Sequence, residues 1–218
     1  MTSERPLRSE REDVSRIGRA LLEKDLTRAS GGNVSARRGG RIAVSPSGIP
    51  YEDVTPEDVP VTDLDGALLD GDHEPSSETP MHTRIYAARE EVGGIVHSHS
   101  PYASTFASLA EPIPASHYLI AFAGKEVPVA GYEPPGSEAL AELAVDALGQ
   151  EHDACLLQNH GVMAVGEDAD AALETAEMVE FVAQVHYQAS AIGEPVVMDD
   201  DDLDYLVDMF GSYREQSK

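Results

Sequence analysis

The feature that most constrains the fold is an alternation of helix-type and strand-type segments along the second half of the chain. Amphipathic helical patterns are separated there by short apolar runs that are flanked by glycine or polar residues. Such alternation is typical of an α/β protein in which helices cover a sheet. The expected helices span residues 80–90, 101–109, 137–148 and 169–191, and the expected strands span residues 94–97 and 154–157.

The rest of the chain carries shorter signals. In residues 10–26, Val14, Ile17 and Leu21 lie on one stripe and predict an amphipathic helix. Because no repeat, linker or change of composition divides the sequence, we expect one α/β domain with a mixed sheet over residues 1–218. Further expected elements are strands at 34–36 and 41–44, a helix start at Thr55-Pro56-Glu57-Asp58, a hairpin of 59–62 with 67–69, and a helix at 200–210.

Charge and composition exclude several classes of function. The 218 residues include 40 Asp and Glu against 15 Lys and Arg, a net charge of −25, so we expect neither nucleic acid nor an anionic membrane as a partner. No apolar run approaches the roughly 20 residues that span a bilayer, and the charged first residues do not resemble a secretory signal. The single cysteine, Cys155, fits a reducing compartment. These features predict a soluble cytoplasmic protein.

Three histidines stand out by context. His97 and His99 flank one serine, so on an extended segment both imidazoles project from the same face, close enough to share a metal ion. His160 follows an apolar strand and precedes a glycine, a place where α/β sheets display functional groups. Three histidines leave one coordination position open, as in catalytic zinc sites. The alternative is a chance pair on an exposed strand and an unrelated turn histidine.

Several hydroxyl- and glycine-rich turns have the composition of an anion site. The turns Ser30–Asn33, Ser47-Gly48 and Ser76-Ser77 offer backbone amides and hydroxyls to a phosphate. Glu78 follows the third turn, just before a helix, and is either a helix-capping acid or a group that acts at the metal. From local sequence, plain turns and a capping glutamate remain alternatives.

Taken in order, these segments resemble the class II aldolase/adducin family, most closely its L-fuculose-1-phosphate aldolase type. Each segment is modest alone, but the ordered set runs from near the N-terminus to His160, and Phe210–Tyr213 extends it to the C-terminal tail. The segments that carry the resemblance are SGGNVSAR (30–37), SPSGIPYEDV (45–54), SSE (76–78), VHSHSPYASTFA (96–107), HYLIAFAG (117–124) and LLQNHG (156–161).

The resemblance implies a fold and a reaction. The fold is a three-layer α/β/α arrangement with a mixed, mainly antiparallel central sheet. The reaction is the zinc-dependent, reversible cleavage of a ketose 1-phosphate, similar to L-fuculose 1-phosphate, into dihydroxyacetone phosphate and a small aldehyde. Mn²⁺ or Co²⁺ is an alternative to Zn²⁺. A small-molecule sugar phosphate is the implied partner, and the implied assembly is a homotetramer.

The resemblance also implies roles for individual residues. The zinc ligands of the family match His97, His99, His160 and Glu78, and the glutamate also transfers a proton in the reaction. A tyrosine matching Tyr118 acts at the aldehyde, and one matching Tyr213 reaches the site of a neighbouring subunit. The residues that match the family's phosphate site are Ser30, Gly32, Asn33, Ser47, Gly48, Ser76 and Ser77.

One departure leaves the aldehyde half open. The fuculose-type enzymes carry an aromatic residue where this chain has Pro135, so lactaldehyde, glycolaldehyde and glyceraldehyde all remain plausible products. The first alternative function is a pentulose-phosphate 4-epimerase of the L-ribulose 5-phosphate type, which breaks and re-forms the same bond on the same metal site. The second is a non-catalytic module, as in the adducin branch, against which the complete set of three histidines and Glu78 counts.

The charge pattern generates a prediction about salt. The chain has three lysines among its 15 cationic residues, and its acids are spread along the whole sequence, a pattern that indicates a salt-in halophile. Because salt screens the repulsion between carboxylates, we expect the unfolding temperature to rise steeply from about 0.1 M to molar KCl. Thermal unfolding over a KCl series checks this, and a flat profile would indicate an ordinary acidic protein instead.

Overall fold

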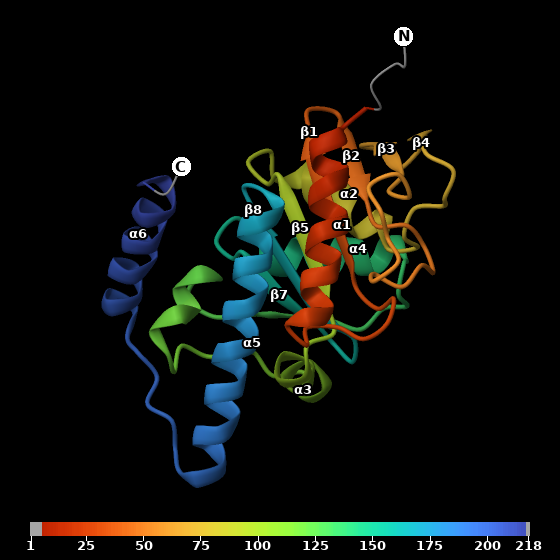
Figure 1. Ribbon diagram of the computed structural model, residues 1–218. Coiled ribbons are helices and arrows are strands. Elements are labelled where there is room, and N and C mark those ends of the chain that lie inside the picture. The colour runs from red at the N-terminus through yellow and green to blue at the C-terminus, as the bar shows by residue number, and fades with distance from the viewer. Residues whose placement is uncertain (1–5, 217–218) are drawn as a thin grey trace.

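The computed structural model describes residues 6–216, with side chains described through residue 211, and within that range the chain forms one eight-stranded sheet (Figure 1). Its order is β4-β3-β2-β1-β5-β8-β7-β6, and neighbours are antiparallel except for the parallel pair β6–β7. The strands are β1 (Asn33–Arg38), β2 (Arg41–Val44), β3 (Val61–Asp63), β4 (Leu68–Asp70), β5 (Gly94–Ser98), β6 (Val129–Ala130), β7 (Ala154–Leu157) and β8 (Gly161–Gly166).

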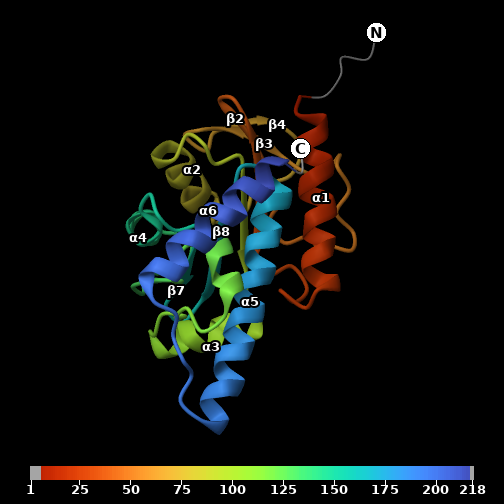
Figure 2. The ribbon, with the colours of Figure 1, turned by 90° about the vertical axis from the view of Figure 1, so that its left-hand side faces the viewer.

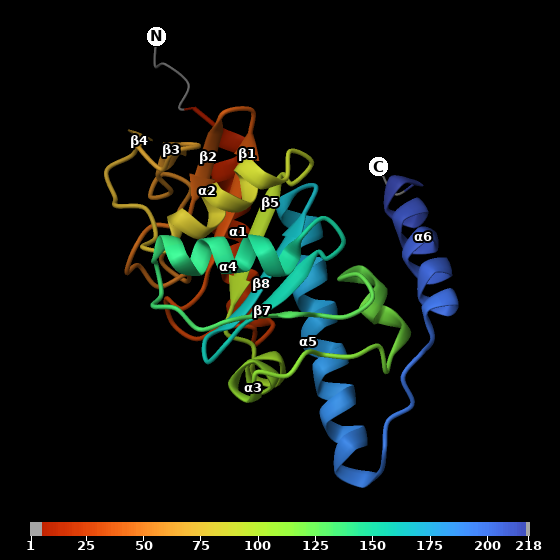
Figure 3. The ribbon, with the colours of Figure 1, turned by 180° about the vertical axis from the view of Figure 1, so that it is seen from behind.

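Helices cover both faces of the sheet, so the predicted three-layer α/β/α fold with a mainly antiparallel sheet is confirmed. The helices are α1 (Arg8–Glu23), α2 (Thr79–Ala88), α3 (Pro101–Leu109), the 3₁₀ helix η1 (Tyr118–Phe122), α4 (Glu138–Leu148), α5 (Ala169–Ile192) and α6 (Asp200–Gln216). One buried cluster lies between the sheet and α1, α3 and α5. A second lies on the opposite face under α2 and α4, which face the viewer in Figure 3.

The predicted hairpin is present as β3 and β4, but the predicted helix start at Thr55–Asp58 is wrong. The side chain of Asp58 accepts hydrogen bonds from the backbone amide and the hydroxyl of Thr55, at 2.9 and 2.7 Å. These contacts close a single turn. Because Pro60 and strand β3 follow at once, no residues remain for a helix.

The sheet brings the start of β1, the end of β5 and the start of β8 together, and the candidate site forms there. These central strands are adjacent, and we call this end of them one edge of the sheet. Strands β1 and β5 are antiparallel and pair Asn33 with His97, so the start of β1 lies beside the end of β5. Strand β8 pairs with β5 on its other side and places Met163 opposite His97. The turn between β7 and β8, which carries His160, therefore lies at the same edge.

The C-terminal helices lie on the outside of this body. The second half of α5 projects beyond the sheet, and α6 lies against η1 after an extended connection (Figures 1 and 2). Phe210 of α6 contacts Phe122, with ring centroids 4.6 Å apart, and Lys125 forms an ion pair with Asp204 at 2.7 Å. No helix within residues 6–216 combines the length and the apolar character that a membrane crossing requires.

Candidate functional site

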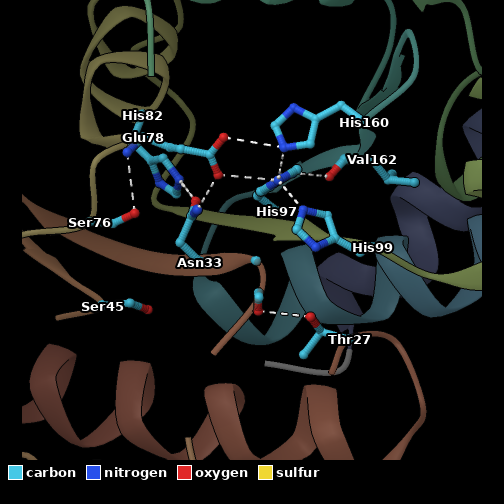
Figure 4. A network of polar contacts seen from close by, with 12 residues as sticks. Thr27, Asn33, Ser45, Ser76, Glu78, His82, His97, His99, His160 and Val162 are labelled. Atoms are coloured by element: carbon cyan, nitrogen blue, oxygen red, sulfur yellow. Dashed lines mark hydrogen bonds and ion pairs between the residues drawn. The ribbon is translucent and has the colours of Figure 1, made fainter. Parts of the chain in front are cut away.

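Three imidazole rings converge at this edge of the sheet (Figure 4). His97 belongs to β5, His99 follows the strand, and His160 lies in the turn between β7 and β8. The Nε2 atom of His97 is 3.0 Å from that of His99 and 3.2 Å from that of His160. Tetrahedral Zn–N bonds imply nitrogen–nitrogen separations of about 3.3 Å. These two separations are close to that value, and all three ring nitrogens lie within 4.8 Å of one another, so the cluster could hold one shared metal ion.

The hydrogen bonds of His97 determine which of its nitrogens faces the cluster. Nδ1 is 2.8 Å from the carbonyl oxygen of Val162 and donates its proton there. Nε2 therefore presents a lone pair to His99 and His160. Burial, and then the neighbouring histidines, lower the pKa of His97 well below its ordinary value, so the ring is neutral. That lone pair is free to bind a metal ion that His97 shares with His99 and His160.

Glu78 completes the cluster. Its two oxygens each lie 3.3 Å from an imidazole Nε2, Oε2 from His97 and Oε1 from His160. The residue is at the N-cap position of α2, but its side chain makes no capping hydrogen bond, so it is not the capping acid that local sequence allowed. Oε1 is buried without a hydrogen-bond partner among the described residues. A buried carboxylate oxygen without a hydrogen bond, beside the ring nitrogens of three histidines, fits a divalent metal.

A cavity of about 270 Å³ adjoins the cluster, and Glu78, His99 and His160 contribute to its wall. None of the described residues that line it is a lysine or an arginine. Backbone amides and hydroxyls are therefore the donors that it offers an anion. The seven residues predicted for phosphate binding all line this cavity: Ser30, Gly32, Asn33, Ser47, Gly48, Ser76 and Ser77.

Glycine is required where the cavity wall meets the histidine strand. Gly32 has φ +69°, and a Cβ there would lie 2.5 Å from the carbonyl oxygen of His97. At Gly161 a Cβ would lie 2.3 Å from the carbonyl oxygen of Ser98 and 2.9 Å from Cδ2 of His99. Both glycines thus allow the backbone to pass directly against the segment that carries the candidate metal ligands His97 and His99.

Of the two predicted tyrosines, Tyr118 does not line this cavity within one chain. Tyr118 is on η1 with 48% of its surface exposed, and its ring stacks on Phe210 of α6 at 6.1 Å. It is absent from the described residues that line the cavity. The backbone of Tyr213 is part of α6, but its side chain is not among those that the structure describes.

Sequence reasoning named no partner for His82, yet the structure joins it to the site. His82 Nε2 is within hydrogen-bond distance of Asn33 Oδ1, and Asn33 Nδ2 donates to Glu78 Oε2 at 2.7 Å. On its other side, His82 Nδ1 is 2.6 Å from the hydroxyl of Ser35. The partners lie 47 and 49 residues away in sequence, so no local pattern reveals them. The one available signal is that His82 follows Glu78 by four positions, which places both on one helix face.

Comparison with known proteins identifies the family. Residues 12–187 match the Class II Aldolase and Adducin N-terminal domain. The chain belongs to the class II aldolase and adducin family. It is 42% identical over 212 residues to the 5-deoxy-D-ribulose 1-phosphate aldolase of Bacillus thuringiensis serovar kurstaki, covering 96% of this chain and 99% of that relative. As a class II aldolase, the protein is an enzyme of the lyase class.

Two further relatives agree with this assignment. The class II aldolase described here is 34% identical over 201 residues to the 5-methylthioribulose-1-phosphate/5-deoxyribulose-1-phosphate aldolase of Rhodospirillum rubrum, covering 92% of this chain and 90% of that one. Its fold matches a solved structure of an L-fuculose 1-phosphate aldolase with a TM-score of 0.91 at 37% identity, covering 93% of this chain and 96% of the other.

Gly161→Ala is expected to weaken metal binding. The added Cβ would press on the Ser98 carbonyl and the His99 ring, so that ring must shift, and it would also lie 3.3 Å from Cε1 of His97. Disturbing the ligands of a metal site, or the contacts that support them, typically lowers the metal affinity about tenfold or more. Competition with a chromophoric chelator measures the Zn²⁺ dissociation constant. Gly40→Ala is the matched control, since a Cβ there meets nothing within 4 Å. Equal affinities in the two variants would contradict the expectation.

His82 is expected to make folding stability depend on pH. Burial lowers its pKa to about 3, with a smaller contribution from His97, while Glu78 acts in the opposite direction. In the unfolded chain a histidine titrates near 6.5. As pH falls from about 6.5 towards 3, the unfolded state gains a proton that the folded state does not bind, so stability falls by up to about 1.4 kcal/mol per pH unit.

The His82→Gln variant isolates this contribution. Glutamine does not titrate, so the free energy of unfolding of the variant should decline less steeply between about pH 6.5 and pH 4. Urea unfolding of both proteins with a metal chelator present gives the two slopes. His97 and His99 titrate in both proteins and cancel in the difference. Parallel slopes would show that His82 does not stay neutral in the folded state.

Proposed function

We propose that this class II aldolase reversibly cleaves a ketose 1-phosphate into dihydroxyacetone phosphate and a small aldehyde, with zinc as its metal and Mn²⁺ or Co²⁺ as alternatives. The observation that carries the proposal is the continuity of one cavity. Its wall combines Glu78, His99 and His160 of the cluster with the turns rich in amides and hydroxyls. A ketose 1-phosphate has its carbonyl one carbon from the phosphate ester, so the molecule spans both halves of such a cavity.

In this proposal each half of the cavity has its own task. His97, His99, His160 and Glu78 would hold the metal, which when bound supplies Lewis-acid polarisation of the ketose carbonyl and its neighbouring hydroxyl. Glu78 moves the proton at the carbon next to the carbonyl. The seven turn residues hold the phosphate, and the N-terminus of α2 adds its positive dipole end behind Ser76 and Ser77. No lysine is needed for a Schiff base.

For the aldehyde, we favour a product without a hydroxyl group. Two relatives at 42% and 34% identity are named for 5-deoxyribulose 1-phosphate, against 35% for the L-fuculose phosphate aldolase of Escherichia coli (strain K12). Cleavage of 5-deoxyribulose 1-phosphate between C3 and C4 leaves acetaldehyde, whereas the fuculose compound leaves lactaldehyde. Pro135 lines the cavity and offers no hydrogen-bond donor to an aldehyde substituent.

We also propose that the tyrosines act across subunits of a homotetramer. Tyr118 is half exposed and away from its own cavity, so it requires another copy of the chain to face substrate. Exposed apolar side chains also lie on α5, on α6 and on the segment that connects them: Phe181, Tyr187, Ile192, Val196, Val197, Tyr205 and Met209. An interface between copies would cover them. A monomer in light scattering at micromolar concentration would refute this arrangement.

The function is tested by dihydroxyacetone phosphate release. We expect release from 5-deoxyribulose 1-phosphate to exceed that from L-fuculose 1-phosphate, to stop with a chelator and to return with Zn²⁺. Glu78→Gln should lose about a hundredfold or more in kcat, because the proton-transfer group is removed. Glu111→Gln, at an exposed position, is the control and should match the unmodified protein. Formation of a 4-epimer without free dihydroxyacetone phosphate would favour the epimerase instead.

A further inference from the structure

A continuous line of buried side chains runs from α2 through β1 to the carboxylate of Glu78. The hydroxyl of Tyr86 is 2.8 Å from that of Ser35, and Ser35 is 2.6 Å from Nδ1 of His82. His82 Nε2 then contacts Asn33 Oδ1, and Asn33 Nδ2 reaches Glu78 Oε2 at 2.7 Å (Figure 4 shows the part from His82 to Glu78). Every member is less than a tenth exposed.

The direction of every hydrogen bond in this line follows from its last member. An ionised carboxylate only accepts, so the Asn33 amide must turn its nitrogen to Glu78 and its oxygen to His82. Nε2 of His82 must then carry the proton. Because burial keeps His82 neutral, its Nδ1 is an acceptor and receives the hydroxyl proton of Ser35. Ser35 in turn accepts from Tyr86.

The reverse direction is disfavoured at both ends of the line. With the Asn33 amide flipped, its oxygen would face Glu78 Oε2 at 2.7 Å, and two acceptors would repel. At the other end, Ser35 would donate to Tyr86, and the tyrosine hydroxyl would need another acceptor. Among residues 6–211, Ser35 is the one hydrogen-bond partner of this hydroxyl. A buried hydroxyl without an acceptor costs about 1–3 kcal/mol.

We propose that His82 is a positioning residue that locks the orientation of the Asn33 amide and thereby holds the Glu78 carboxylate against the three histidines. His82 itself does not line the cavity, and among the described residues its ring hydrogen-bonds to Ser35 and Asn33 rather than to the candidate metal ligands. It acts through Asn33, which lines the cavity and contacts Glu78. The role of Glu78 in catalysis rests on the proposed function, but the orientation of the amide and its effect on metal affinity do not.

The tautomer of His82 is a direct test on the unmodified protein. Long-range nitrogen–proton correlation spectra distinguish the protonated from the unprotonated ring nitrogen, and His82→Gln assigns the signals by their disappearance. We expect a single neutral tautomer at pH 7 with the proton on Nε2. A proton on Nδ1, a charged ring or a mixture of tautomers would overturn the proposal, because Asn33 would then be free to flip.

A pair of substitutions tests the positioning role itself. His82→Gln keeps an amide donor at the place of Nε2, whereas His82→Leu removes it. We expect His82→Leu to weaken Zn²⁺ binding about tenfold or more, and to lower kcat with little change in KM. His82→Gln should stay within about threefold of the unmodified protein. Equal losses in both variants would overturn the proposal, as would unchanged metal affinity in His82→Leu.

Ser35→Ala provides the second variant, with Ser15→Ala as its matched control. Both serines are about 99% buried, but Ser15 donates only to the Glu12 carbonyl of its own helix. We expect Ser35→Ala to broaden the His82 tautomer signals and to raise the Zn²⁺ dissociation constant several-fold. Ser15→Ala should change neither. The tautomer and the metal affinity are measured without substrate, so failure of the aldolase assay would leave this test intact. Equal effects of the two alanine substitutions would refute the positioning role of His82.

Discussion

The antiparallel pairing of β1 with β5 is the constraint on which the rest of the site depends. It places Asn33 directly opposite His97, so a residue of the cavity wall and a candidate metal ligand share one rung of the ladder. Strand β8 on the other side of β5 supplies the Val162 carbonyl that orients His97. A slip of one residue in this register would turn His97 to the other face of the sheet. The register therefore brings the loop residues His99 and His160 beside His97 of β5.

The sequence predicted the local motifs of this site better than the long-range contacts that join them. The H-x-H spacing, the glycine after His160 and the hydroxyl-rich turns are local patterns, and the structure gathers all of these residues at one edge. Helices with strong apolar periodicity were likewise predictable. Strand β8 was missed because its continuous apolar run follows His160 directly, with no separate turn signal. The environment of His82 was not predictable, because its partners are brought in by strand pairing.

The cavity also shows how a strongly acidic chain can receive an anion. Its described lining has no cationic side chain, while the molecule as a whole carries a charge of −25. Backbone amides, hydroxyls and the N-terminus of α2 provide partial positive charges at fixed places. A metal ion at the histidines would add a full positive charge beside this lining. The net negative charge repels an anion at long range, where salt screens it, whereas the donors of the cavity attract the anion at hydrogen-bond distance.

The attachment of α6 has a consequence for how the molecule opens. The helix is joined to the body by an extended segment. Phe210 packs on Phe122 of η1, Leu203 is buried, and Asp204 forms an ion pair with Lys125, which follows η1. Its release would expose little of the two core clusters, so the free energy needed to detach it is smaller than that of global unfolding. Amide hydrogens of α6 should therefore exchange through their own local opening. In a single copy of the chain, we expect α6 to exchange faster than the inner sheet that holds the histidines.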